Sequence, residues 1–272
     1  MLLKDKVAVI TGGGGGLGEG IALCMAKEGA NIVVSDLNQE LAEKTAAKIK
    51  GMGQKSLAIS TDVTKKDQCR KLISESLKGM GNIDILVCGA GVGGFTHRPD
   101  SDEPLILENI SEKDWNTTID VNLKGTFLCI QAIAAHFRKQ KSGKIINVSS
   151  IGGRNGLDWV PHYSASKAGV IVLSQGIAVQ LAPFGINVNT ICPGVIRTPM
   201  WDAGAKVLGQ AYPPFKGLNP DQVFQGIVEN IIPMKRPQTA EDIGQTAVFL
   251  ASENAREITG QAINVDGGAC FN

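Results

Sequence analysis

The stretch VAVITGGGGGLGEGIALCMAKEGA, residues 7–30, joins an apolar run to a glycine cluster and then to a helix-like segment. The run VAVIT at 7–11 has the length and β-branched content of a buried strand. Glycines directly after a strand let the backbone approach a pyrophosphate, and the N-terminus of the following helix favours that anion. No Gly-Lys-Ser/Thr follows, which excludes a Walker-type phosphate loop. The segment therefore predicts a dinucleotide-binding loop, with a plain flexible glycine turn as the alternative.

The register of this glycine loop is ambiguous in the sequence. Gly13, Gly15 and Gly18 satisfy G-x-G-x-x-G, whereas residues 11–18 satisfy T-G-x-x-x-G-x-G. Motifs further along the chain favour the second register.

Seven apolar β-type runs are spread along the whole chain, and helix-like stretches separate them. They lie at residues 7–11, 31–36, 55–60, 83–90, 144–150, 186–192 and 261–266. Near-continuous apolar strands joined by helical crossovers are typical of a mostly parallel sheet with helices on both faces. No linker or shift in composition divides the chain. We therefore expect an α/β fold, a single doubly wound Rossmann-fold domain over residues 1–272.

Charge and composition exclude several classes of protein. The chain has 27 Lys and Arg against 26 Asp and Glu, a formal net charge of +1, and no long block of like charge, so we expect no nucleic-acid partner. No apolar run approaches the roughly 20 residues of a membrane span. The apolar run between Lys6 and the glycines is also far shorter than the about 7–15 residues of a secretory signal. The predicted location is the cytoplasm, without membrane association.

The cysteines and histidines are dispersed. Six cysteines form no C-x-x-C pair, and three histidines show no H-x-x-x-H spacing of the kind that places two ligands on one helical face. Isolated cysteines of this kind are typical of reduced, buried thiols. The sequence therefore predicts neither a disulfide framework nor a metal site.

Asp36 ends the second predicted strand, 18 residues beyond Gly18. An acid about 20 residues after the glycine loop accepts a hydrogen bond from the ribose 2′-hydroxyl of NAD, and its charge repels the 2′-phosphate of NADP. Neither Leu37 nor the glycine run offers an Arg or Lys to neutralise that phosphate. We expect NAD as the cofactor, although Asp36 alone is also compatible with a helix N-cap. Asp62, after the third strand, is predicted either to cap its helix or to contact adenine.

Tyr163 and Lys167 stand one turn apart at the start of a helix predicted over 163–182, after a strand that ends at Ser149 and Ser150. Their i, i+4 spacing places phenol and ammonium on one helical face. A nearby ammonium stabilises the phenolate and lowers a pKa that is otherwise about 10. Tyr163 is therefore a candidate general acid–base. An ordinary surface helix can also contain a Tyr and a Lys four residues apart. Together with the upstream glycine loop, however, the pair favours the catalytic interpretation.

With these residues in place, the sequence closely resembles the short-chain dehydrogenase/reductase family over essentially its whole length. The matching motifs, in chain order, are T-G-x-x-x-G-x-G at 11–18, Cys88-Gly89-Ala90-Gly91 as a variant of N-N-A-G, Asn122 in VNLKG, Ser150, the Tyr163/Lys167 pair, and PGVIRT at 193–198. Tyr163 follows Ser150 by 13 positions, which matches the usual family spacing. This spacing selects Ser150 over Ser149, which is then expected to be structural.

The resemblance implies a role for each residue of the catalytic set. Tyr163 would be the general acid–base, and Ser150 would hydrogen-bond the substrate oxygen. Lys167 would bind the nicotinamide ribose and tune Tyr163. Asn122 would hold a water that links Lys167 to solvent in a proton relay.

The resemblance also implies a cofactor site. Thr198 and the Val195 backbone would hold the nicotinamide carboxamide, and Asp62 and Val63 would contact adenine. The full implied set comprises Gly12, Gly16, Leu17, Gly18, Asp36, Asp62, Val63, Ala90, Gly91, Tyr163, Lys167, Pro193, Val195 and Thr198.

Two departures from the family pattern lie after the fourth strand. Cys88 and Gly89 replace two asparagines, from which we expect altered local hydrogen bonding and unchanged chemistry. The stretch between Gly91 and Trp115 is longer than usual for the family and would lie near the pocket rim. Its polar residues either contact a polar substrate or form a solvated charged loop, and we favour the loop. These residues are His97, Arg98, Asp100, Asp102 and Glu103.

The helix predicted over 163–182 is apolar on nearly all sides, and a second long helix is predicted over 114–139. A helix without a polar face must be covered on both sides. One side would pack on the sheet and the other on a second subunit, so we expect a homo-oligomer, a tetramer or a dimer. The alternative is that the segment 199–235 or other loops cover that face within one chain.

The segment 199–235 follows PGVIRT and corresponds to the substrate lid of the family. Its TPMW start and the terminal VDGGACFN are similar to polyol dehydrogenases and acetoin/butanediol reductases. This likeness implies hydride transfer between NAD(H) and a small diol, polyol or sugar alcohol. Trp159 and Trp201 are predicted to line the substrate pocket. Further candidate walls are Met200, His162 and Phe215.

Three other functions stay open in the sequence. A hydroxysteroid or bile-acid dehydrogenase is a close competitor. A 3-oxoacyl-carrier-protein reductase is the next enzyme alternative, although Asp36 argues against the NADPH that such reductases usually use. The alternative from a different class is a non-catalytic nucleotide-sensing module. The complete set Asn122, Ser150, Tyr163 and Lys167 argues against that module.

Overall fold

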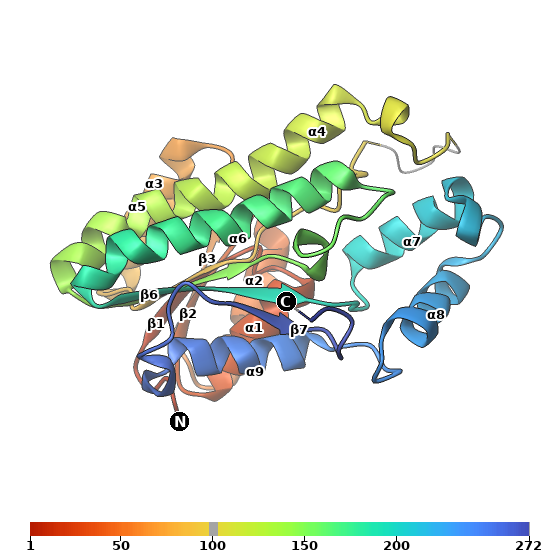
Figure 1. Cartoon of the computed structure of the whole chain (residues 1–272). Helices are drawn as coiled ribbons and strands as arrows, with labels where there is room; N and C mark the ends of the chain where they lie inside the picture. Colours follow the sequence, from red (N-terminus) through yellow and green to blue (C-terminus); the bar gives the residue numbers. More distant parts are fainter. Residues whose placement is uncertain (98–102, 272) are drawn as a thin grey trace.

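A seven-stranded sheet runs through the centre of the molecule (Figure 1). In the computed structural model, which describes residues 1–97 and 103–271, the strand order is β3-β2-β1-β4-β5-β6-β7 and every neighbouring pair is parallel. The strands are β1 Val7–Thr11, β2 Asn31–Asp36, β3 Ser56–Ser60, β4 Ile85–Cys88, β5 Gly143–Val148, β6 Ile186–Pro193 and β7 Ala262–Val265. All the predicted strands are confirmed, with ends shifted by one or two residues. The order reverses between β1 and β4, the switch point at which such sheets bind ligands.

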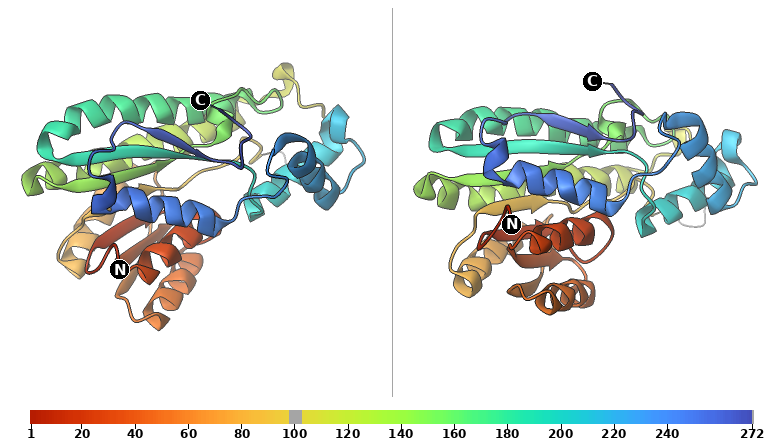
Figure 2. Two further views of the ribbon diagram at one scale, coloured as in Figure 1. Left: turned by 60° about the horizontal axis from the view of Figure 1, so that its bottom comes forward. Right: turned by 90° about the horizontal axis from the view of Figure 1, so that it is seen from below.

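Helices cover both faces of the sheet, as the two views of Figure 2 show. The core of one face contains α1 Gly16–Lys27, α2 Gln39–Gly51 and α9 Ala240–Ala251. The core of the other contains α3 Lys66–Met80, α5 Gly125–Gln140 and α6 Pro161–Leu181. The arrangement is the single doubly wound domain that the sequence predicts.

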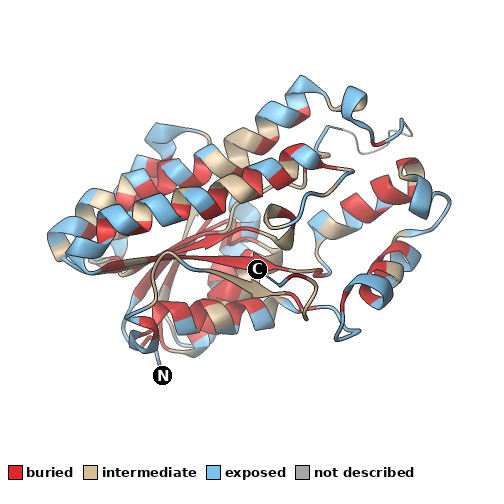
Figure 3. Ribbon diagram, in the orientation of Figure 1, coloured by how far each residue is buried: buried red, intermediate tan, exposed pale blue. Residues whose placement is uncertain are grey.

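The two faces have separate hydrophobic cores because successive side chains of a strand point in opposite directions. Ala8 and Ile10 of β1 join the core under α1 and α9, whereas Val9 joins the core under α3 and α5. Figure 3 shows buried residues along the sheet and on the inner sides of the helices. Cys69 and Cys129 meet in the second core with 3.8 Å between their sulfurs. All six cysteines are buried, as predicted, and none of them forms a disulfide in the described part of the chain.

The helix predicted over 114–139 is present but interrupted. Helix α4, Glu112–Ile119, passes into a π-helical segment, Asp120–Lys124, before α5 begins. Such wide turns are rare inside helices and occur often at functional sites. This one contains the buried Asn122, one of the residues that the sequence singles out.

The segment 199–235 forms a helical layer beyond the carboxyl ends of the strands (Figure 1). Helices α7, Pro199–Ala211, and α8, Pro220–Ile231, pack on each other through a small core of their own. The Tyr212 hydroxyl donates a hydrogen bond to Asp158 Oδ2 at 2.8 Å and ties the end of α7 to the loop before α6. The layer therefore covers the edge of the sheet where the predicted site residues lie.

Helix α6 with the turn after it, Pro161–Phe184, is long and apolar enough to cross a membrane by length and composition alone. In the structure it lies along β6 and against α4, as one layer of the domain. Its outer side exposes Val172 and Val179. Helices α7 and α8 lie at the end of α6 and do not cover this side (Figure 1), so the alternative that 199–235 buries it is wrong.

Candidate active site

The loop between β1 and α1 requires glycine at three positions. Gly12 and Gly16 have φ values of +67° and +54°, a region that other residues rarely adopt. A Cβ on Gly18 would lie 2.0 Å from the carbonyl oxygen of Gly12. These glycines belong to T-G-x-x-x-G-x-G. The structure therefore selects this register over the one through Gly13 and Gly15.

Helix α1 begins at Gly16 without a side-chain cap, because its N-cap is the extended Gly15. The first N–H groups of a helix have no partner within the helix, and an anion such as a pyrophosphate satisfies them. Leu17, in the same turn, lines the cavity described below. The loop thus fits the diphosphate of a dinucleotide next to a cavity.

Asp36 lies directly against this loop. Its carboxylate accepts hydrogen bonds from the N–H groups of Gly14 and Asn38, each at 3.0 Å. Asn38, rather than Asp36, caps α2, because the Asn38 side chain accepts from the Leu41 N–H. The simple N-cap interpretation of Asp36 is therefore wrong. The carboxylate brings a negative charge to the phosphate loop.

Asp62 and Val63 follow β3, two strands away from the switch point. The Asp62 carboxylate accepts from the N–H and the hydroxyl of Thr64 at 2.9 and 2.7 Å. Since the N-cap of α3 is Lys65, Asp62 fastens the turn before the helix and does not cap it. Val63 is buried, and a Cβ on Gly125 would lie 2.7 Å from its side chain. Their contact with adenine stays a prediction.

Thr11, the last residue of β1, holds the loop after β4. Its hydroxyl oxygen accepts the N–H groups of Gly89 and Ala90 at 3.2 and 3.4 Å, and it donates to the Val87 carbonyl at 3.4 Å. Cys88 is buried in the core and contributes packing. The two strand ends are thus joined by a threonine hydroxyl and backbone groups.

Ser150, Tyr163 and Lys167 come together where β5 ends and α6 begins. The Ser150 hydroxyl accepts the Gly152 N–H at 3.0 Å and also hydrogen-bonds the Tyr163 side chain. Ser149 instead donates to the backbone carbonyl of Lys167 at 2.8 Å. This bond gives Ser149 the structural role that the spacing predicts.

Burial dominates the electrostatics of the tyrosine and the lysine. It raises the pKa of Tyr163 above its usual value, against the opposing effect of the hydrogen bond with Ser150. Burial also lowers the pKa of Lys167 to about 8. The Lys167 ammonium donates to the Val148 carbonyl at 3.0 Å and lies 5.9 Å from the centre of the Tyr163 ring. In the chain by itself the net shift of the Tyr163 pKa is upward, because desolvation outweighs the hydrogen bond with Ser150, and a lowering by the Lys167 ammonium stays a prediction.

Asn122 fastens the loop after β4 to helix α6. Its Oδ1 accepts the Val92 N–H at 2.8 Å, and its Nδ2 donates to the Val92 carbonyl and to Ser166 Oγ, both at 3.0 Å. A Cβ on Gly91 would lie 3.3 Å from both Asn122 Oδ1 and Lys167 Nζ. Asn122 is therefore next to the lysine. Its part in a proton relay stays a prediction.

The segment after β6 bears on one expected cofactor contact. The Val195 N–H donates to Gln238 Oε1 at 3.0 Å, and the Val195 carbonyl accepts the Gln238 N–H at 3.1 Å. Gln238 thus occupies the Val195 N–H, whereas the Val195 carbonyl keeps a second lone pair. Pro193, Ile196 and Thr198 line the neighbouring cavity.

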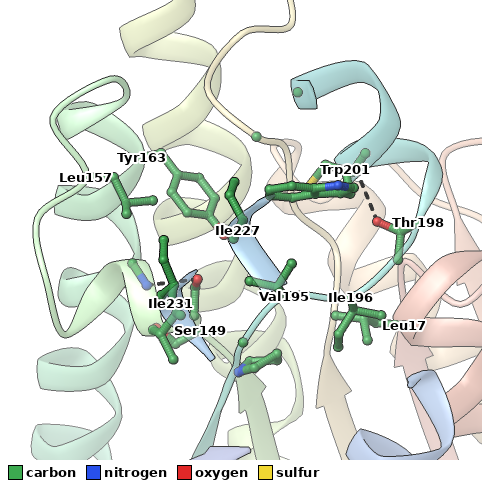
Figure 4. Close-up of a pocket in the computed structure, with 18 of the residues that line it drawn as sticks. Leu17, Ser149, Leu157, Tyr163, Val195, Ile196, Thr198, Trp201, Ile227 and Ile231 are labelled. Carbon is green, nitrogen blue, oxygen red and sulfur yellow. Dashed lines mark hydrogen bonds between the residues drawn. The ribbon is translucent and has the colours of Figure 1, made fainter. Parts of the chain in front are cut away.

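A cavity of about 230 Å³ opens between the predicted catalytic residues and helices α7 and α8 (Figure 4). Tyr163 lies on one side of it and Trp201 on the other. Trp159 and Met200 also line it, in the positions that the sequence predicts for pocket walls. Its walls are otherwise mostly apolar, and they include four residues that the sequence did not single out. These are Phe95, Leu157, Ile227 and Ile231.

Other predicted contacts lie elsewhere. His162 is buried behind the cavity wall, and Phe215 packs on Tyr212 within the lid layer, so neither lines the cavity. His97 and Glu103 are exposed and lie outside the lining, as expected for a solvated loop. Three more residues of that loop fall outside the described part of the chain: Arg98, Asp100 and Asp102.

Known proteins share this sequence and this arrangement. Residues 6–206 match the family model described as short chain dehydrogenase. A 3-oxoacyl-[acyl-carrier-protein] reductase of Staphylococcus epidermidis is 37% identical over 265 residues, 97% of this chain and 98% of that protein. A diacetyl reductase [(S)-acetoin forming] of the same species is 38% identical over 268 residues, 98% and 99% of the two chains.

A solved structure shows the same fold. NAD⁺-bound xylitol dehydrogenase superimposes with a TM-score of 0.86 at 27% identity, and the match covers 98% of this chain and 100% of that one. The glycine loop, the acid beside it and the Ser-Tyr-Lys cluster under an apolar cavity agree with these similarities. The chain therefore belongs to the short-chain dehydrogenase/reductase family, oxidoreductases that act on CH–OH groups.

Proposed function

We propose that the protein interconverts a small secondary alcohol or diol and the corresponding ketone, with NAD(H) as its cofactor. The observation that carries this proposal is the position of Ser150 and Tyr163 in the wall of the cavity, next to Leu17 of the glycine loop. A diacetyl reductase and a xylitol dehydrogenase among the similar proteins support this class of substrate.

Each of the residues around the cavity has its own role in the proposed reaction. When bound, the nicotinamide supplies or accepts the hydride. In reduction, the Tyr163 hydroxyl donates a proton to the substrate oxygen while the Ser150 hydroxyl hydrogen-bonds that oxygen, and in oxidation the phenolate takes the proton back. Lys167 holds the nicotinamide ribose. Tyr163 regains its proton through Lys167, and Asn122 holds the water that links Lys167 to solvent.

The choice of NAD rests on Asp36. Its carboxylate lies against the Gly14 N–H, with no arginine or lysine at the adjoining position 37. A ribose 2′-hydroxyl can donate to this carboxylate, whereas a 2′-phosphate would be repelled. We assign the carboxamide contact to Thr198 and the Ile196 backbone, in place of Val195.

A homo-oligomer and a cytoplasmic location complete the proposal. The exposed Val172 and Val179 lie seven residues apart on one face of α6, and Phe127 is exposed on the neighbouring α5. A second copy of the chain would cover this apolar face, in a dimer or a tetramer. The buried thiols, none of which forms a disulfide among the described residues, agree with a reducing compartment.

The test is NADH formation from NAD⁺ with a panel of vicinal diols, polyols, simple secondary alcohols and hydroxysteroids. Tyr163→Phe should abolish nearly all turnover and leave NADH affinity close to that of the wild type, because only the proton carrier is lost. Turnover that survives in this variant would refute the role of Tyr163. NADH binding without turnover of any compound would favour the nucleotide-sensing alternative.

A further inference from the structure

The side of the cavity formed by Phe95 is built from three separate segments of the chain. The Phe95 ring stacks on Trp159 with 6.2 Å between ring centres and 22° between their planes. A Cβ on Gly93 would lie 2.5 Å from this ring, and a Cβ on Gly204 of α7 would lie 2.8 Å from it. The ring therefore rests on two glycines that leave room for it. The loop after β4, the loop before α6 and the lid helix all meet at Phe95.

His162 anchors the backbone next to Phe95. Its Nε2 lies 2.7 Å from the Gly94 carbonyl oxygen, and because a carbonyl only accepts, Nε2 carries the proton. The imidazole is 2% exposed, and its Nδ1 has no hydrogen-bond partner. Gly94 has a φ of +88°, and a Cβ there would lie 3.0 Å from His162 Nε2. The loop can approach the start of α6 this closely only with glycine at 94, and the imidazole then fixes its carbonyl.

The cavity offers a substrate few polar partners. Four lining side chains carry hydroxyl groups: Ser149, Ser150, Tyr163 and Thr198. Ser149 already donates to the Lys167 carbonyl, and Thr198, whose oxygen accepts the Trp201 N–H at 3.2 Å, is assigned to the nicotinamide carboxamide. Ser150 and Tyr163 hydrogen-bond each other, and both belong at the reacting oxygen. Among the other lining side chains, the Trp201 indole N–H is a buried donor without a partner. A second or third substrate hydroxyl further into the cavity would find at most this one N–H donor and would be buried largely unpaired.

We propose that this cavity selects an alcohol or ketone whose reacting carbon carries an apolar flank, and that His162 is the positioning residue that holds Phe95 against Trp159 to form the wall for that flank. The inference rests on the proposed reaction and narrows its substrate class. Within the small alcohols considered, it favours those with one polar end over those with a hydroxyl on every carbon. His162 acts through the Gly94 carbonyl and does not touch the substrate.

The first experiment compares cyclohexanol with xylitol in NAD⁺-dependent oxidation by the wild-type protein. We expect kcat/KM for cyclohexanol to be higher by at least about tenfold, because most of the additional hydroxyls of xylitol lose water without finding partners. Equal or better use of xylitol would overturn the inference and leave the proposed reaction standing. No turnover of any alcohol, with NADH binding intact, would overturn both.

The second experiment tests His162 by comparing two alcohols. It measures the ratio of kcat/KM for cyclohexanol to kcat/KM for 2-propanol, a molecule too small to contact the wall formed by Phe95. His162→Leu should lower this ratio about tenfold, mainly through KM for cyclohexanol, because the Gly94 carbonyl loses its donor and releases Phe95. His162→Gln, whose amide can donate to the same oxygen, should restore most of the ratio. The matched control is His97→Leu. His97 is a surface histidine in the loop that contains Phe95, and its side chain hydrogen-bonds Thr117.

A change on the other side of the ring gives an independent check. Gly204→Ala places a methyl group against Phe95 and should lower the same ratio, whereas Gly226→Ala in α8, where the nearest atom to an added Cβ is 4.0 Å away, should not. Thermal unfolding confirms that each variant folds. If His162→Leu and Gly204→Ala reduce the two alcohols equally, the positioning role is wrong and these residues only maintain the fold.

Discussion

At the scale of single residues, Asp36 is expected to decide between the two nicotinamide cofactors. Asp36→Ala should narrow the preference for NAD over NADP by about ten- to hundredfold, because one charge-assisted hydrogen bond and one repulsion are lost together. Asp36→Asn separates the two effects, since it keeps an acceptor and removes the charge. The measurement is kcat/KM for both cofactors, with Asp67→Ala on the exposed side of α3 as control. Unchanged discrimination in Asp36→Ala would place cofactor choice elsewhere.

Lys167 should give cofactor binding a pH dependence. Its charged form is the protonated one, and burial lowers its pKa to about 8. The ammonium that we assign to the nicotinamide ribose is therefore present below this pH and lost as the pH rises through it. NADH affinity of Tyr163→Phe, measured by fluorescence, should fall across that range. A flat profile would contradict the assignment, and Lys167→Met should bind weakly at every pH.

At the scale of secondary structure, the turn from β1 into α1 contains two kinds of glycine. The backbone requires glycine at Gly18 but not at Gly15. Gly18→Ala forces a methyl group onto the Gly12 carbonyl, whereas nothing lies within 4 Å of a Cβ on Gly15. We expect Gly18→Ala to lower the free energy of unfolding by about 1–3 kcal/mol and Gly15→Ala to leave it nearly unchanged. Thermal unfolding without added nucleotide measures this difference free of any clash with a cofactor. Equal loss in both variants would mean that the loop is not packed as described.

At the scale of the whole molecule, the outer face of α6 should be an interface between copies of the chain. Val172 and Val179 are 67% and 76% exposed. Glutamate at both positions should lower the mass measured by light scattering, because charges would be buried in the interface. Leu107→Glu, at a residue that is 74% exposed on a distant turn, is the control. A monomeric wild-type protein, or an unchanged mass in the double variant, would refute the interface.

Also at this scale, the similar proteins agree on the reaction and differ in substrate. One is a carrier-protein reductase, one a diacetyl reductase and one a xylitol dehydrogenase. The shared fold brings the strand ends, the glycine loop and the catalytic helix to one edge of the sheet. Specificity then depends on the loops that cover this edge.

The sequence by itself determined the parallel sheet, the glycine loop, Asp36 and the Tyr163/Lys167 pair. These features depend on local rules: strand periodicity, the conformational freedom of glycine, and the spacing of residues on a helix. The family resemblance supplied the roles of these residues. It assigned the carboxamide to Thr198 and the Val195 backbone, whose N–H is paired with Gln238 in the tertiary structure.

Only the tertiary structure decided how the substrate cavity is built. Phe95, Trp159 and Gly204 lie on three segments with no common pattern in the sequence. From the sequence alone, His162 is a candidate for the pocket wall and not a residue behind it. Their contacts depend on how the crossovers bring the loops together. The direction of the pKa shift of Tyr163 also depends on the fold, because burial sets it, and no spacing along a chain specifies how much water a folded site excludes.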